Sequence, residues 1–118
     1  MPDFPLSITP VTGTYSKAND LLEQNVFQIT AAKVTKFTMG FLDLVNLTQT
    51  TTIRVYVSID AVNNRIIDQI SWTVAHQDGL PVTELTVQAN QVITVSVQSA
   101  VLEGNTRDIP YSYTLKEE

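Results

Sequence analysis

The residue types that carry most catalytic chemistry are scarce in this chain. It has a single histidine, His76, and no cysteine. A serine nucleophile needs a histidine base in a defined setting, and no Gly-x-Ser-x-Gly turn is present. His76 follows an expected strand and stands beside Asp78, as a loop or strand-end histidine does. We therefore predict no catalytic residues and no enzymatic activity.

Metal and cofactor sites also find little support. One imidazole without thiolates does not make a zinc site. Asp60, Asn63 and Asn64 form the only local cluster of oxygen ligands suited to calcium, and tight turns use the same residue types to bond their own backbone. Glycoside hydrolysis requires two acids that face each other across a cleft. Asp43 is the one acid among apolar neighbours in a long strand, but a bulge at Gly40 would turn it outward, so we do not assign it a catalytic role. We expect no metal and no cofactor.

The spacing of glycines and basic residues disfavours phosphate and nucleic-acid recognition. The four glycines stand far apart, so we expect no phosphate-binding loop. The seven Lys and Arg residues are scattered and form no basic stripe. No apolar run approaches the roughly 18 residues of a membrane span, and residues 1–10 lack the features of a secretory signal. We expect neither a nucleic-acid nor a membrane partner.

The composition suits one domain with a polar but weakly charged surface. The chain has 118 residues, of which 43% are hydrophobic and 16% charged, and its formal net charge is −5. A chain of this length buries enough surface to fold without a disulfide or a metal. The charged fraction is below the usual value of about 25%, and Thr, Val, Gln, Ser and Asn take its place.

Alternation of apolar and polar residues predicts strands along most of the chain. Residues 53–60 alternate strictly, with the apolar residues Ile53, Val55 and Val57 on one face. After a turn near Asn63 the chain returns through residues 66–74, which predicts a hairpin. Within residues 33–47 the apolar residues switch from one face of the strand to the other. This switch predicts a bulge or bend near Gly40.

Further strands are expected near the C-terminus. Residues 85–87 and 92–97 flank Ala89-Asn90, which predicts a second tight hairpin. Alternating Ile109, Tyr111, Tyr113 and Leu115 predict the last strand. In total, about seven to nine strands with short connections indicate an all-β, antiparallel β-sandwich of the jelly-roll kind.

Residues 1–12 are predicted to form an extended, Pro-rich N-terminal arm that precedes a single sandwich domain over residues 13–118. Prolines at positions 2, 5 and 10 prevent a helix and disfavour a central strand. The arm is too apolar for a solvated tail, since it carries Phe4, Leu6 and Ile8. Two interpretations stay open: the arm folds back on its own domain, or it docks on a neighbouring subunit. In the second case Phe4, Leu6 and Ile8 bind the partner.

Two aromatic residues in the predicted hairpin have different expected environments. Trp72 lies two residues from both Ile70 and Val74, so the three side chains share one face of the strand. This favours a place in the core for Trp72. Tyr56 lies on the face of the strand opposite to Ile53 and its apolar neighbours. It is therefore the aromatic residue expected to face solvent or a partner. We add Tyr56 to the candidate partner-binding residues.

Three segments give the chain a resemblance to the small β-sandwich decoration or auxiliary proteins of tailed-bacteriophage heads. They are TGTYSKANDLLEQNVFQI, TTIRVYVSIDAVNNRIIDQISWTV and RDIPYSYTL, within residues 11–115. The resemblance is one of strand pattern, and the turn at residues 60–65 lacks the glycine expected in that family. It implies a capsid-decoration (cement) protein, made in the host cytoplasm, that binds the major capsid protein or another virion protein on the capsid surface. It also implies a homo-oligomer, with a trimer favoured.

Two classes of function therefore remain for the chain. The first is a non-enzymatic virion structural protein that stabilises the outer head lattice. The second is a carbohydrate- or protein-binding β-sandwich module of a surface or tail-fibre protein.

Overall fold

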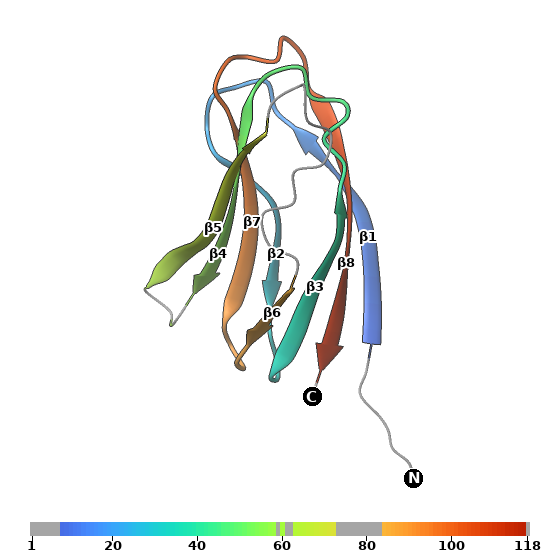
Figure 1. Ribbon diagram of the computed structural model, residues 1–118, viewed down its shortest axis with the longest axis vertical. Helices are drawn as coiled ribbons and strands as arrows, with labels where there is room; N and C mark the ends of the chain where they lie inside the picture. Colours follow the sequence, from blue (N-terminus) through green and yellow to red (C-terminus); the bar gives the residue numbers. More distant parts are fainter. Residues whose placement is uncertain (1–7, 59, 61–62, 73–83, 118) are drawn as a thin grey trace.

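The described part of the chain consists of antiparallel strands. The computed structural model describes residues 8–58, 60, 63–72 and 84–117, and these form eight strands and no helix (Figure 1). No described segment is therefore a helix long and apolar enough to cross a membrane. The strands are β1 (Ile8–Lys17), β2 (Gln24–Thr30), β3 (Thr35–Leu42), β4 (Thr51–Ser58), β5 (Asn64–Trp72), β6 (Glu84–Val87), β7 (Val92–Ser99) and β8 (Arg107–Glu117).

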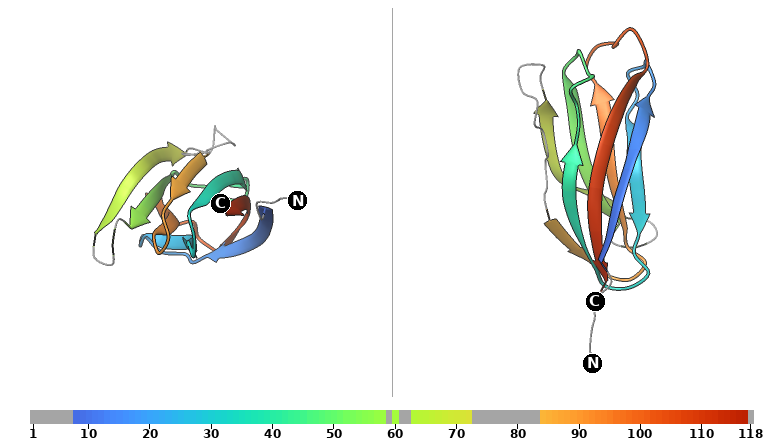
Figure 2. Two further views of the ribbon diagram at one scale, coloured as in Figure 1. Left: turned by 90° about the horizontal axis from the view of Figure 1, so that it is seen from below. Right: turned by 90° about the vertical axis from the view of Figure 1, so that its right-hand side faces the viewer.

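The strands form two four-stranded sheets that pack face to face (Figure 2). One sheet has the order β1-β8-β3-β6 and the other β2-β7-β4-β5. Consecutive strands lie in opposite sheets except for the β4–β5 hairpin, which is the strand order of a jelly roll. The predicted all-β, jelly-roll-like sandwich is thus confirmed.

The core lies between the two sheets and follows the predicted alternation. On β4, buried Ile53, Val55 and Val57 alternate with half-buried polar residues, as expected for a strand with one inner face. Four aromatic rings pack together between the sheets, with centroid distances from 4.7 to 6.1 Å. They belong to Phe27, Phe37, Tyr111 and Tyr113. The predicted last strand is therefore confirmed, and its alternating apolar residues pack in or against the core.

The boundary between the predicted arm and the sandwich lies earlier in the chain than expected. β1 begins at Ile8 and pairs with β8 along its whole length, from Ile8 opposite Lys116 to Lys17 opposite Arg107. Residues 8–12 therefore belong to the sheet, because Pro10 is tolerated in an edge strand. This part of the arm folds onto its own domain, whereas residues 1–7, with Phe4 and Leu6, lie outside the described residues.

Two local predictions for the middle of the chain are confirmed. The register between β3 and β8 shifts between Met39 and Phe41, so Gly40 is the extra residue of a bulge. β4 and β5 pair antiparallel as a hairpin. At its turn the Asp60 carboxylate accepts a hydrogen bond of 2.8 Å from the Asn63 backbone, which is the turn role expected for these residues.

The second predicted hairpin is wrong, because β6 and β7 belong to different sheets. A tight turn does occur there: Gln91 N donates to Gln88 O at 3.2 Å, and Asn90 has a φ of 71°. However, Asn90 N donates to Ala31 O and Ala31 N donates to Gln91 O, so β7 pairs with β2. β6 pairs with β3 instead. The turn is local, but the strand pairing is set by distant residues.

The prediction that favoured Trp72 for the core, because it shares a strand face with Ile70 and Val74, is not followed by the edge strand β5. Ile70 shares its face of the strand with Trp72, yet Ile70 is 38% exposed. β5 is an edge strand, and the face that carries Ile70 is less buried than the inner faces of the central strands. The side chain of Trp72, together with Val74 and His76, lies outside the described residues.

Candidate binding surface at the loop end

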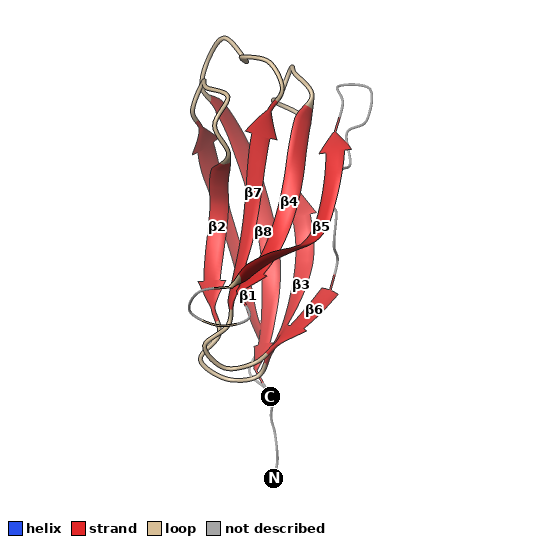
Figure 3. Cartoon of the chain, turned by 90° about the vertical axis from the view of Figure 1, so that its left-hand side faces the viewer, coloured by secondary structure: helices blue, strands red, loops and turns tan. Residues whose placement is uncertain are grey.

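Three loops from distant parts of the sequence meet at one end of the sandwich, which we call the loop end (Figure 3). They join β1 to β2, β3 to β4 and β7 to β8. Gly104 N donates to Asn19 Oδ1 at 2.9 Å, and Gln98 Nε2 donates to the backbone oxygen of Leu21 at 3.1 Å. Asn46 Nδ2 donates to the backbone oxygen of Asp108 at 3.0 Å. The loops therefore form one connected surface.

Glu103 is the central connector of these loops. It lies in the β7–β8 loop and is only 5% exposed. Thr48 donates to its Oε1 from the backbone N at 2.8 Å and from Oγ1 at 2.7 Å, and Gln49 N donates to its Oε2 at 3.0 Å. Arg107 Nε forms an ion pair with Oε1 at 3.4 Å, without hydrogen-bond geometry. One carboxylate thus holds two loops and the start of β8 together.

The electrostatics of the loop end keep Glu103 ionised. Burial alone raises the pKa of a carboxyl group, but the hydrogen bonds from Thr48 and Gln49 and the nearby ammonium of Lys17 outweigh that effect. The pKa of Glu103 is therefore lowered. Lys17 is itself fully buried, and its Nζ donates to the backbone oxygen of Ala18 at 3.3 Å. The buried charges of opposite sign compensate one another.

The side chain of Gln24 fixes the β1–β2 loop. Its Oε1 accepts hydrogen bonds from Ala18 N at 2.8 Å and from the Tyr15 hydroxyl at 2.9 Å. Its Nε2 donates to Ala18 O at 3.0 Å and to Asp20 Oδ1 at 2.9 Å. Asp20 Oδ1 also accepts from Leu22 N at 3.0 Å. This segment is therefore a loop that its own hydrogen bonds hold in place.

Large apolar side chains are exposed on all three of these loops. Their exposed fractions are 48% for Leu21, 69% for Leu22, 55% for Val45, 56% for Val101 and 51% for Leu102. Single exposed apolar residues are ordinary, but several on one connected surface mark an interaction site. The loop end is therefore the candidate binding surface, and it is suited to bind apolar protein surfaces.

Tyr56, a predicted partner-binding residue, lies on the outer face of the β2-β7-β4-β5 sheet and is half-buried. Its hydroxyl donates to Glu23 Oε2 at 2.6 Å, and Ser96 Oγ donates to the same oxygen at 2.5 Å. Arg54 forms an ion pair with that oxygen at 3.6 Å. Desolvation, the hydrogen bond to Glu23 and its negative charge raise the pKa of Tyr56. Tyr56 thus fixes the start of β2 to the sheet, and its partner contact stays a prediction.

The other predicted partner-binding residues are only partly described. Ile8 starts β1, where its backbone pairs with Lys116, and its side chain lies outside the described residues. Phe4 and Leu6 lie outside them entirely. Sequence reasoning missed the loop-end residues. The available signal was the pair Leu21-Leu22 inside an otherwise polar connection, and likewise Val101-Leu102 just before Gly104-Asn105.

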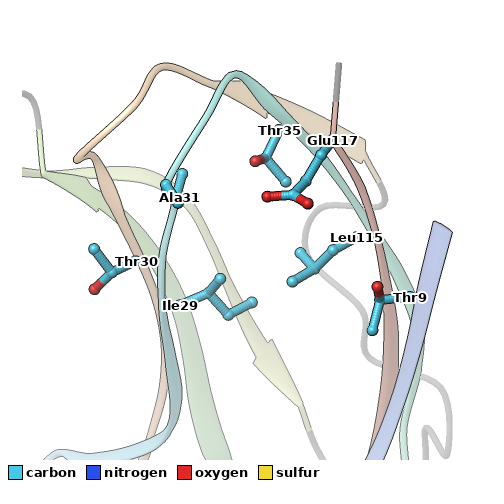
Figure 4. A pocket seen from close by; sticks show the side chains of 8 residues that line it. Thr9, Ile29, Thr30, Ala31, Thr35, Leu115 and Glu117 are labelled. Atoms are coloured by element: carbon cyan, nitrogen blue, oxygen red, sulfur yellow. The ribbon is translucent and has the colours of Figure 1, made fainter. Parts of the chain in front are cut away.

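A cavity of about 210 Å³ lies at the opposite end, between the two sheets (Figure 4). Figure 4 shows Ile29 of β2 and Leu115 of β8 turned toward each other, with Thr9 of β1 beside them. Thr35 and Glu117 lie close together, farther from Ile29. Ile29, Ala31, Ala32 and Leu115 form its apolar lining, and Thr9, Thr30, Thr35 and Glu117 form its polar lining.

The described residues hold no group of His, Cys, Asp and Glu side chains arranged to bind a metal ion. Glu103 and Glu23 have lowered pKa values, but hydrogen bonds within the protein occupy both carboxylates. These carboxylates therefore have structural roles in the sandwich.

Comparisons with known proteins support the fold alone. No protein-family model matches the sequence, and no curated protein matches it. The structure is similar to one solved in work on Bacillus endospore appendages, described as a novel family of disulfide-linked pili. The TM-score is 0.57 at 11% identity, over 99% of this chain and 93% of that chain.

A second solved structure contains the CBM22-1 and GH10 modules of Clostridium thermocellum xylanase 10B with xylohexaose. It matches with a TM-score of 0.44 at 13% identity, over 94% of this chain and 26% of that chain. That likeness is too low to carry an argument. The pilus likeness supports the β-sandwich, and neither structure is described as a phage decoration protein.

Proposed function

We propose that the chain is a non-enzymatic structural subunit that binds a larger particle through its loop end. The observation that carries this proposal is the set of exposed apolar residues on three loops, which Glu103 and its neighbours hold together. An ordered apolar surface loses little conformational entropy on binding, because hydrogen bonds already fix its loops. Such a surface suits a stable lattice contact.

The particle that we propose is the head of a tailed bacteriophage. The support is the resemblance of three sequence segments to small β-sandwich decoration proteins, which the jelly-roll strand order suits. In this role the chain is made in the host cytoplasm, binds the major capsid protein or another virion protein from outside, and acts as a homo-oligomer, with a trimer favoured. The chain contains no cysteine, so its contacts with other subunits include no disulfide.

The carbohydrate-binding alternative has less support. Sugar rings stack on exposed aromatic faces, whereas Tyr56 is half-buried and its hydroxyl is bonded to Glu23. The polar residues beside it also bond one another, since Arg54 donates to Gln69 and to Gln98, each at 2.8 Å. A glycan screen that detects specific binding, lost in Tyr56→Ala, would favour this alternative.

Charged residues on the loop end are expected to abolish particle binding. The double variant Leu22→Asp/Leu102→Asp places two carboxylates where an apolar contact forms, and at these exposed positions we expect a change in stability of only about 0.5 kcal/mol. Binding is measured by co-sedimentation with heads of a phage whose genome encodes the chain. We expect at least a tenfold loss of binding and an unchanged Tm.

The matched control is Ile66→Asp/Ile67→Asp, on exposed positions of β5 away from the loop end. It should bind heads like the unmodified chain. Equal binding by all three proteins would rule out the loop end as the contact surface. Absence of binding by the unmodified chain would rule out decoration of that head.

A further inference from the structure

The three loops of the loop end carry acidic residues and no basic ones. They span residues 18–23, 43–50 and 100–106, which contain four acids and no Lys or Arg. The four acids are Asp20, Glu23, Asp43 and Glu103. Asp108, at the start of β8, is a further acid and is exposed. The exposed apolar residues of this surface therefore stand among charges of one sign.

The basic residues that contact the loop end bond groups of the chain itself. Lys17 is fully buried, and its Nζ donates to a backbone oxygen of the β1–β2 loop. Arg107 pairs with Glu103 at 3.4 Å, and Arg54 pairs with Glu23 at 3.6 Å. The other three acids form no ion pair within the described part of the chain. We call them the acidic border of the loop end: Asp20, Asp43 and Asp108.

Two carboxylates of the acidic border are fixed directly beside exposed apolar side chains. Asp20 Oδ1 accepts a hydrogen bond from Leu22 N at 3.0 Å, and Asp43 Oδ1 accepts one from Val45 N at 3.0 Å. Leu22 and Val45 are both exposed. Among the described residues, no donor bonds Oδ2 of either aspartate. A partner's ammonium or guanidinium group can therefore pair with these carboxylates while its apolar residues contact the loops.

The charge of this surface disfavours a second copy as its occupant at neutral pH. A second loop end would bring the same acidic border against the first, and like charges across a contact cost affinity and slow association. Basic side chains on a partner remove that cost and form pairs instead. Apolar burial then supplies most of the affinity, and the charge pairs supply the orientation and the association rate.

We infer that the loop end binds a protein surface whose apolar residues are bordered by Lys or Arg side chains. The inference rests on the proposed function, because it states the chemistry of the contact through which the chain binds its particle. It assigns the loop end to a different protein, so contacts between copies in a homo-oligomer use other surfaces of the sandwich.

Neutralising the acidic border tests the inference on phage heads. In Asp20→Asn/Asp43→Asn the amide oxygens still accept the same backbone hydrogen bonds, so the loops keep these bonds and lose two charges. The matched control is Asp68→Asn/Glu84→Gln, which removes two charges from β5 and β6. In co-sedimentation with heads, we expect the loop-end variant to bind roughly three- to thirtyfold more weakly. The control should change binding by about twofold at most.

The two variants separate a local effect from one of total charge. Equal weakening in both would mean that binding follows the net charge, and the inference would be wrong. Unchanged binding by Asp20→Asn/Asp43→Asn would also overturn it. The proposed function would still stand in that case, provided that Leu22→Asp/Leu102→Asp abolishes binding.

A pair of short peptides tests the same chemistry without phage heads. One peptide carries Leu residues among Lys residues, and the other has Glu in place of each Lys. Amide shifts of the ¹⁵N-labelled chain are recorded by NMR at neutral pH. With the Lys peptide we expect saturable shifts at Leu22, Val45 and Leu102, and weaker binding by Asp20→Asn/Asp43→Asn. With the Glu peptide we expect none.

The peptide experiment decides the inference whether or not heads are bound. Equal shifts with both peptides, or shifts that avoid the loop end, would overturn it. Loop-end shifts that appear with protein concentration alone at neutral pH would mean that a second copy binds there, and the inference would be wrong. Loop-end shifts with the Lys peptide and no binding to heads would rule out the proposed particle alone.

Discussion

At the scale of single residues, Glu103 makes the stability of the fold depend on pH. Its pKa is lowered in the folded chain, so folding favours the ionised form. The stabilisation is fully present above the pKa of an unfolded glutamate, about 4.3, and is lost as the pH falls through the folded-state value. We expect Glu103→Gln to cost about 2–4 kcal/mol at neutral pH. The difference between the two proteins should shrink below about pH 4.

Urea unfolding of both proteins across this pH range measures the effect. Glu84→Gln is the control, because Glu84 pairs with Lys36 at 3.1 Å on the surface and its side chain is 56% exposed. That exposed pair should contribute at most about 1 kcal/mol. A Glu103→Gln cost that stays constant down to acidic pH would contradict an ionised, hydrogen-bonded carboxylate.

The burial of Glu103 is also the clearest limit of prediction at this scale. The sequence places it before Gly104-Asn105, in a polar loop where an exposed acid is the ordinary expectation. Its partners Thr48 and Gln49 stand 55 and 54 residues earlier. No local pattern reports such a contact, because it exists only once three loops have converged.

At the scale of secondary-structure elements, the pairing of β1 with β8 requires a glycine at position 13. Gly13 lies opposite Tyr111, and a Cβ there would lie 2.5 Å from the Tyr111 hydroxyl oxygen and 2.7 Å from the ring carbon that bears it. We expect Gly13→Ala to destabilise the fold by about 1–3 kcal/mol through overpacking, as measured by thermal unfolding. In a Tyr111→Leu background the cost should largely disappear. An equal cost in both backgrounds would place its origin outside this contact.

Strand positions were predictable where one face of the strand is buried and the other is exposed to solvent. β4 follows that rule along its whole length, because it lies inside its sheet and Ile53, Val55 and Val57 face the core. The pairing of β6 was not predictable from its sequence. Its four residues lie next to β7 along the chain, but they pair with β3 in the other sheet. A tight turn does not determine whether the strands beside it share a sheet.

At the scale of the whole molecule, exposed apolar loops and acidic net charge act in opposite directions. The formal net charge of −5 opposes contact between copies at neutral pH. Leu22 and Leu102 favour association through the loop end. The sequence predicted an apolar surface on the arm and not on the loops, because the exposure of Leu22 depends on how Gln24 and Asp20 fold its loop.

Association should therefore peak where the net charge vanishes, near the sequence pI of about 4.6. Light scattering across acidic pH should show a maximum there for the unmodified chain. Leu22→Ser/Leu102→Ser should remove most of it, since these substitutions lower the apolar surface without altering the charge. Ile66→Ser/Ile67→Ser on β5 is the matched control and should retain the maximum. Equal loss in both double variants would mean that association follows total exposed apolar area, and the loop end would have no special role in it.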